Sequence, residues 1–342
     1  VGTSTLYTVQ SVRDPDGDSS RGRLLGPPSL VGQGERTQPE WLYKFLLNPY
    51  QVRALTVLRM PKFNLAKADA QTLVDYFGAV ERMHNTGVGP SYPFETIRQQ
   101  DAANDEFWRQ RTKDYVARLK TTKAADGKSS VLEQRVAELT PIWQQIQKDY
   151  EGKQADAKQK SSGWEVRTKA SRAAEKKAEA DPKLKDQLEQ LKATADADEK
   201  QLGIWQQEAE RLNNLVASSA VEKQRAQWEK EEAYITDAYR IVMNRALCLQ
   251  CHSIGTVETK NEIMGPSLTN AHQRLRPGWV ERWIADPQRF LPYKSSMPVN
   301  FPPDKPGQFS EYFAGTSLER IQAIRDVVMI LPRASALPVN RY

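Results

Sequence analysis

Apolar side chains recur at helical spacing along most of this chain. Residues 41–47 and 66–80 repeat apolar positions every three or four residues, and the later stretches 277–285 and 316–331 do the same. That spacing gathers apolar side chains on one face of a helix. A further helical stretch, 233–246, runs up to the first cysteine. The pattern predicts an all-α fold.

The middle of the chain is long, polar and rich in Ala, Glu, Lys and Gln. Its apolar residues recur at spacings near three and four in 131–146 and again in 184–215. A break is expected just before Ser130, the next N-cap, and Asp181-Pro182 is a typical helix start. We expect two or three long helices folded back as an antiparallel hairpin or coiled coil. The very polar residues 147–180 are expected at its exposed far end, with one extended helix or partial disorder as alternatives.

The two ends of the chain repeat one another. Short motifs recur in the same order and at similar spacing: Gly26-Pro-Pro-Ser-Leu30 with Gly265-Pro-Ser-Leu268, Trp41-Leu-Tyr-Lys-Phe-Leu46 with Trp279-Val-Glu-Arg-Trp-Ile284, Asn48-Pro49 with Asp286-Pro287, and Met60-Pro61 with Met297-Pro298. We interpret this as one architecture used twice. The expected domains are a module at 1–95, a long charged helical hairpin at 96–232 and a second module at 233–342.

Charge and hydropathy narrow the classes of partner. The net charge is +6, and both signs crowd together between residues 101 and 240, so the excess lies in the flanking parts. A positive balance of this kind favours a partner protein with an acidic surface. A nucleic-acid-binding protein would instead be expected to carry a basic patch with interleaved aromatic residues. No apolar run reaches the roughly 18 residues of a membrane-spanning helix, so no transmembrane segment is expected. The start at Val1 without Met is typical of a processed chain or one lacking its beginning.

The chain has only two cysteines, and His252 follows the second of them directly. Cys248-Leu-Gln-Cys251-His252 is a C-x-x-C-H motif, in which two thiols can add to the two haem vinyl groups while the imidazole binds the iron. A zinc site would need further ligands, and His84 and His272 stand at no zinc spacing. A thioredoxin-like redox pair would need a βαβ unit. The motif predicts one covalently attached haem c.

The second axial ligand of the iron is expected from further along the chain. Met297 lies in a Pro-bounded loop ahead of the last helix, where a thioether can fold over the opposite haem face. Met264 is too close to His252, and Met329 reads as helix core. His272 is the runner-up ligand, although a surface position beside a helix suits it better.

Residues 248–331 resemble a class I cytochrome c domain: a helix into C-x-x-C-H, a Gly-Pro-x-Leu turn, a Met-Pro loop and a closing helix. The resemblance implies that the carbonyl of Pro266 orients His252. It also implies that Trp279 and Trp283 pack on the haem or its propionate edge, unless they simply fill the core.

Residues 26–80 resemble the distal half of a similar domain, of the kind carried by membrane-associated respiratory cytochromes of bacteria. The run Arg59-Met60-Pro61-Lys-Phe63 is typical of that group, but residues 7–13 offer neither thiol nor His. Met60 would bind a second haem only if a C-x-x-C-H segment lies upstream of Val1 or comes from another subunit. Otherwise this copy has lost its haem and survives as a docking module.

These features together predict an extracytoplasmic, for example periplasmic, electron-transfer protein and not an enzyme in its own right. It would pass single electrons to other electron-transfer proteins as a peripheral subunit of a membrane-associated respiratory or photosynthetic complex. One alternative is a structural or assembly subunit of such a complex in which the haem is secondary. A peroxidase-like enzyme is another, but it would need an open iron position in place of the Met297 ligand.

Overall fold

The computed structural model describes residues 29–53, 60–83, 101–180, 185–257, 259, 265–290, 295–305 and 307–342. Within these ranges every regular element is a helix, and β-type pairing is limited to isolated bridges. The all-α prediction is therefore confirmed. The chain divides into two compact units, Val1–Val131 with Lys230–Arg341 and Leu132–Glu229 with Tyr342. The domain boundaries expected after residues 95 and 232 stay predictions.

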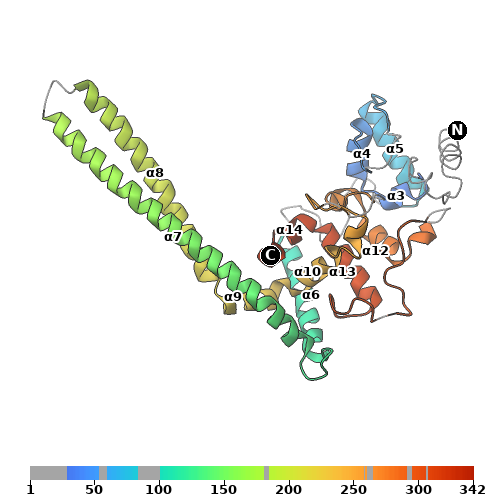
Figure 1. The fold of residues 1–342 in the computed structure, drawn as a ribbon. Coiled ribbons are helices and arrows are strands. Elements are labelled where there is room, and N and C mark those ends of the chain that lie inside the picture. Colours follow the sequence, from blue (N-terminus) through green and yellow to red (C-terminus); the bar gives the residue numbers. More distant parts are fainter. Residues whose placement is uncertain are drawn as a thin grey trace, which may run out of the picture. The chain divides into compact units, whose positions relative to one another are not determined.

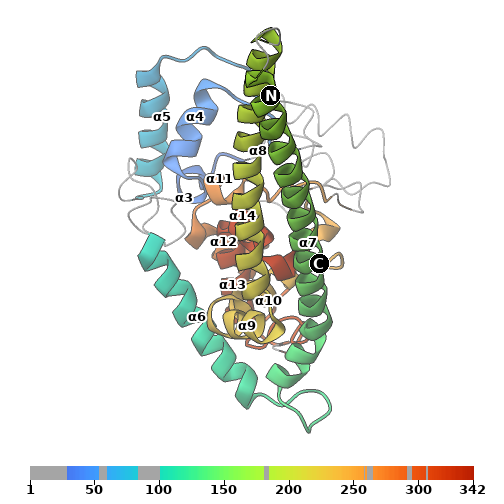
Figure 2. The same cartoon turned by 90° about the vertical axis from the view of Figure 1, so that its left-hand side faces the viewer.

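The second unit is an antiparallel helical hairpin. Its arms are α7 (Val131–Glu179) and α8 (Lys185–Ser218), which lie side by side along their length (Figures 1 and 2) and are followed by the short α9 (Val221–Gln227). Three contacts pair the arms in opposite chain directions: Gln154 with Asn213, Ser171 with Asp198, and Glu179 with Lys192. The predicted hairpin is confirmed.

The polar part of this hairpin is a continuous helix. α7 runs unbroken for 49 residues, so residues 147–179 are helical and mostly exposed. The predicted break before Ser130 is present as a turn in which the Asp126 carboxylate accepts hydrogen bonds from the backbone N–H groups of Lys128 and Ser129. α7 then begins at Val131. Asp181-Pro182 lies outside the described residues.

The core of the first unit forms around α10 (Ala233–Val242), which packs against both α6 (Asp101–Thr121) and α13 (Ser317–Met329). Buried polar groups join the three helices. The Tyr234 hydroxyl donates to the Asp326 carboxylate at 2.8 Å, and the Tyr115 hydroxyl donates to Asp237 at 3.0 Å. Arg325 pairs with Asp326 at 2.7 Å, which neutralises a fully buried carboxylate.

The helix ends of this unit agree with those predicted from the sequence, except at the end of α10. α12 (Pro277–Ala285) matches the predicted 277–285, while the predicted 316–331 is α13 followed by a short α14 (Leu331–Ala336). The helix predicted over 233–246 is wrong at its end, because α10 stops at Val242. Beyond it the Asn244 side chain accepts a hydrogen bond from the Ala246 N–H at 2.7 Å. Asn competes in this way with helical backbone bonding, so the chain enters Cys248 through a turn.

The N-terminal module consists of α3 (Gln33–Arg36), α4 (Pro39–Leu47) and α5 (Lys67–Val80), so the helices predicted over 41–47 and 66–80 are present. α3 and α4 have four and nine residues, as do α11 (Ala271–Arg274) and α12. The residues after α3 and α11 also share their dihedral angles, φ −105° and ψ 146° for Thr37 and φ −102° and ψ 146° for Leu275. The sequence repeat is therefore also a repeat of structure.

The two copies bind each other reciprocally. Thr37 and Leu275, which are equivalent residues, form an antiparallel bridge. On either side the Gln38 N–H donates to the Arg274 carbonyl and the Arg276 N–H donates to the Arg36 carbonyl, both at 2.9 Å. The Gln38 and Arg276 side chains also donate to the carbonyls of Leu275 and Thr37, at 2.8 and 2.9 Å. Equivalent residues of the two copies therefore make the same hydrogen bonds to each other, and the two copies are related by a local twofold axis at this contact.

Candidate functional site

The C-x-x-C-H segment folds as one tight turn. Cys248–Gln250 forms a 3-10 helix, and the N–H groups of Cys251 and His252 both donate to the Cys248 carbonyl, at 3.2 and 2.9 Å. Leu249 anchors the turn because only 2% of its surface is exposed. The two cysteines are half-buried and are not joined by a disulfide. One turn therefore presents two free thiols and an imidazole.

The state of the thiols bears on what this turn can bind. Burial raises the pKa of the Cys248 thiol to about 12, so it is neutral at pH 7. A zinc site or a redox-active pair works through the thiolate. In the described part of the chain, moreover, no three His, Cys, Asp or Glu side chains are grouped to hold a metal ion. The described residues therefore offer no further ligand group for a zinc ion beside this turn.

The His252 imidazole is oriented by the backbone. Its Nδ1 lies 2.7 Å from the Pro266 carbonyl oxygen, which can only accept, so Nδ1 carries the proton and Nε2 keeps its lone pair. Burial lowers the pKa of His252 and keeps the ring neutral. A neutral imidazole with its other nitrogen fixed in this way is the usual form of a metal ligand.

Gly265 covers one flank of the imidazole ring. A Cβ atom at this position would lie 2.5 Å from Cε1 and 2.7 Å from Nδ1 of His252, so a side chain cannot fit. The Gly265 N–H also donates to the Cys251 carbonyl at 2.5 Å and ties the two segments together. From the sequence, Gly265 was predicted only to lie in a turn, and its contact with the ring was missed because that contact depends on tertiary structure.

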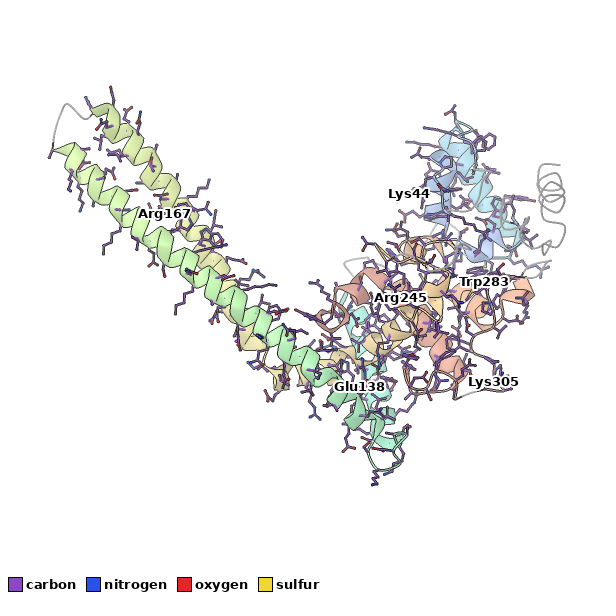
Figure 3. The ribbon with its side chains drawn as sticks, in the orientation of Figure 1. Lys44, Glu138, Arg167, Arg245, Trp283 and Lys305 are labelled. Atoms are coloured by element: carbon purple, nitrogen blue, oxygen red, sulfur yellow. The ribbon has the colours of Figure 1, made fainter. Side chains whose placement is uncertain are left out.

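Met297 is held by an aromatic group on α12. The Trp283 indole N–H donates to the Met297 sulfur at 3.0 Å (Trp283 is labelled in Figure 3). Trp283 stacks on Trp279 with ring centres 5.0 Å apart, and the edge of Phe290 contacts Trp279 at 6.3 Å. In the described residues no hydrogen bond or ring contact joins this group to His252. The predicted site residues therefore fall into two groups, one around each proposed axial ligand.

The other candidate ligands occupy ordinary structural positions. Met60 is partly buried against the Leu42 and Leu46 core of the N-terminal module. The Nδ1 atom of His272 lies 3.1 Å from the Thr269 carbonyl. Met329 is 2% exposed inside α13, as expected for core. His84 and Met264 lie outside the described residues.

The aromatic pair of α12 has a counterpart in the N-terminal module. Trp41 and Phe45 stack with centres 4.9 Å apart and an interplanar angle of 14°, against 5.0 Å and 18° for Trp279 and Trp283. The hydrogen bonds differ, because the Trp41 N–H donates to the Tyr50 hydroxyl at 2.9 Å. The N-terminal module thus has the same stacked pair of aromatic rings, but its tryptophan donates to a tyrosine hydroxyl and not to a methionine sulfur.

Arg274 is a further residue that the sequence reasoning missed. Burial and the nearby charges of Arg36 and Arg53 lower its pKa to about 10, and its own charge helps to lower the pKa of His252. The surroundings of the imidazole are therefore electropositive and suit an anionic ligand such as a porphyrin with two carboxylates. The repeat could have signalled it, since Arg36 is the equivalent residue of the first copy.

Membrane crossing by a helix of the described segments is excluded, since none is both long and apolar enough. Comparisons of the chain with protein-family models, with curated proteins and with solved structures found no match. The interpretation of this site therefore depends on its motif and its geometry.

Proposed function

We propose that this chain is a c-type cytochrome that transfers single electrons. Cys248 and Cys251 would hold one haem c through thioether bonds, and His252 and Met297 would be the axial ligands of its iron. One observation carries the proposal: an imidazole oriented by the Pro266 carbonyl at 2.7 Å follows directly after two free thiols on one turn.

The residues fit such a group in three respects. The thiols are unpaired, so both sulfurs are available for addition to a vinyl group. The Nε2 lone pair of His252 remains available for iron, and Gly265 fills the space on one flank of the ring. Arg274 supplies positive charge for the propionates. When bound, the haem supplies one-electron chemistry between ferrous and ferric iron.

The chain's own residues would set the properties of that iron. The hydrogen bond to Pro266 fixes the imidazole tautomer and raises the basicity of Nε2. The Met297 thioether would favour the reduced state of a bound iron, and the Trp283 N–H donates to its sulfur and holds it in place. Burial of Trp279 keeps water from that side of the aromatic group.

We place the protein outside the cytoplasm, as a peripheral subunit of a membrane-associated respiratory or photosynthetic complex. The positive excess of the flanking regions suits acidic partner proteins, and the hairpin offers a long surface of both charges that a lone electron carrier would not need. In this arrangement the first unit carries the electron and the second unit contributes attachment.

The test is a pyridine haemochrome assay on protein purified from its native source, set against protein mass. One haem per chain, lost in Cys248→Ser and Cys251→Ser, is the expected result. Absence of a Soret band from the native protein would overturn the proposal. Two haems per chain would indicate a further attachment motif outside this sequence, with Met60 as its candidate ligand.

A scaffold role is the second candidate, and the hairpin favours it because it forms a compact unit that contains none of the site residues. Deletion of residues 132–229 separates the two functions. A scaffold loses assembly of its complex, whereas an electron carrier retains its redox titration and electron delivery.

A further inference from the structure

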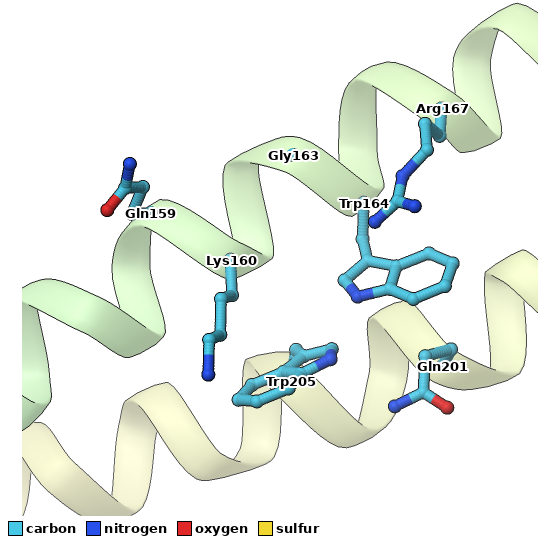
Figure 4. A pocket seen from close by; sticks show the side chains of 7 residues that line it. All are labelled: Gln159, Lys160, Gly163, Trp164, Arg167, Gln201 and Trp205. Atoms are coloured by element: carbon cyan, nitrogen blue, oxygen red, sulfur yellow. The ribbon is translucent and has the colours of Figure 1, made fainter.

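The hairpin contains a hollow that electron transfer does not use. It lies between the two arms and is lined by side chains from both, Gln159, Lys160, Gly163, Trp164 and Arg167 of α7 and Gln201 and Trp205 of α8 (Figure 4). No lining residue is acidic. We call it the α7–α8 hollow.

Two indoles form the apolar surface of the hollow, and a cation lies over each. Lys160 reaches from α7 toward Trp205 of α8, with its Nζ atom 4.9 Å from the ring centre. The Arg167 guanidinium carbon lies 3.9 Å from the ring centre of Trp164. Both indoles are half-buried in an otherwise polar hairpin. Cation–π contacts hold the two charges in place but leave them uncompensated.

Neither cation has a carboxylate partner in the described part of the chain. Some cations of the hairpin are paired, Arg172 with Glu199, Lys192 with Glu179, and Arg211 with Glu208. Lys160 and Arg167, like Lys158 and Lys169 near them, have no ion pair with any residue that the structure describes, and these two are the cations that line the hollow. The hollow therefore carries two positive charges beside an aromatic surface.

Gly163 leaves the space between the two cations open. It lies three residues after Lys160 and four before Arg167, so the three share one face of α7. A Cβ atom here would meet nothing within 4 Å. Glycine is unfavourable inside a helix, and the packing of the hairpin does not require it at this position.

We propose that the α7–α8 hollow is a docking site for an acidic segment of a partner protein. Carboxylates of the segment would pair with Lys160 and Arg167, and a planar or apolar side chain between them would lie against the indoles of Trp164 and Trp205. The amides of Gln159 and Gln201 can bond its backbone. This inference goes beyond electron transfer and does not depend on the haem.

The surroundings favour a protein segment over an anionic membrane. Exposed acidic side chains such as Glu165 and Glu199 lie close to the hollow along the two helices, so a flat anionic surface would meet both signs of charge. A side chain that enters the hollow meets two cations and no carboxylate among the lining residues. Charge complementarity is therefore confined to the concave part.

The experiment uses the full-length protein and a fluorescein-labelled peptide of alternating Glu and Tyr, with binding followed by fluorescence anisotropy at low salt. We expect saturable binding that weakens as salt rises. The variants Lys160→Glu, Arg167→Glu and Trp205→Ala should each weaken it at least tenfold. A peptide of alternating Lys and Tyr should not bind.

Gly163→Leu gives the sharpest comparison, because it adds a side chain to the lining of the hollow at a position where a Cβ atom meets nothing within 4 Å. It should preserve or increase helix content by circular dichroism. Gly152→Leu is the matched control, since it is an exposed glycine of the same helix, its Cβ also meets nothing, and it does not line the hollow. Binding should fall at least tenfold in the first variant and stay unchanged in the second. Equal binding by both, no binding by the unchanged protein, or a preference for phosphatidylglycerol vesicles that the same variants abolish would each overturn the proposal.

Discussion

At the scale of single residues, the His252 imidazole is fixed by two backbone neighbours, Gly265 and Pro266. Gly265→Ala would place a Cβ atom 2.5 Å from the ring, so either the ring or the turn must move. We expect a loss of about 1–3 kcal/mol in unfolding free energy, typical of overpacking, together with a changed Soret spectrum. Chemical unfolding and absorption spectroscopy measure the two effects.

Gly278→Ala is the control for this substitution, because a Cβ at Gly278 meets nothing within 4 Å. It should leave both the spectrum and the stability close to those of the unchanged protein. If Gly265→Ala behaves in the same way, the turn does not constrain the ring as described.

Met297 and Met329 allow a second matched comparison of residues. Met297→Leu removes the thioether held by Trp283, so the midpoint potential should fall and added imidazole should bind the iron. Met329→Leu is nearly isosteric within the α13 core and should leave the potential unchanged. Redox titration with and without imidazole distinguishes them. An unaltered potential in Met297→Leu would exclude Met297 as the ligand, and retained peroxidase turnover would favour the enzyme alternative.

The candidate ligands could be proposed from the sequence because the spacing of Cys248, Cys251 and His252 is typical of covalent haem attachment. The role of Gly265 could not be named, because it depends on how the turn after the motif approaches the imidazole. Arg274 could have been found only through the repeat, in which Arg36 is its equivalent. The indole-to-sulfur bond of Trp283 was likewise hidden, since the sequence suggested only packing for that residue.

At the scale of elements, the contact of α10 with α13 depends on a buried hydroxyl. Tyr234→Phe removes the donor to Asp326 but leaves that carboxylate paired with Arg325. We expect a loss of about 1–3 kcal/mol in unfolding free energy, because a buried acceptor loses one partner. Tyr239→Phe, at a buried residue of the same helix, is the control. Urea unfolding of both variants should show the larger loss for Tyr234; equal losses would contradict the role of the bond.

Helix positions were largely predictable, because proline and capping residues mark them. Pro39 and Pro277 lie at the first helical positions of α4 and α12, and Thr316 caps α13 in a capping box with Glu319. The end of α10 was not predictable, since apolar residues continue past Val242 while the chain turns at Asn244, whose side chain accepts from the Ala246 N–H. The buried pair Arg325 and Asp326 also breaks the apolar pattern of α13.

At the scale of the whole molecule, the first unit contains the helical core with the candidate site, and the second unit is the hairpin. Replacing residues 132–229 with a flexible Gly/Ser linker should leave the haem spectrum and the midpoint potential unchanged, because every proposed haem contact belongs to the first unit. Binding of the acidic peptide should disappear. Absorption spectra, redox titration and anisotropy measure these three properties. A first unit that loses its haem would show that the hairpin is needed for the site.

The internal repeat was visible in the sequence, but the reciprocal contact between its copies was not. Thr37 and Leu275 pair through backbone groups, which every residue carries, so the pairing leaves no mark in the side-chain pattern. α6 lies within residues 96–232, the predicted hairpin region, and packs against α10. Its apolar residues do not reveal which helix they face.

The position of the hairpin in the chain affects the order of folding. α6 and α10 are neighbours in the core, yet the whole second unit separates them along the chain. A flexible segment of that length would make their encounter slow, because closing a long loop costs chain entropy. The hairpin, by contrast, needs only contacts between its own arms. Trp143, near the start of the unit in the chain, packs against Trp228, near its end, with ring centres 6.0 Å apart. An early hairpin would bring α6 and α10 within reach, so the core is expected to form after it.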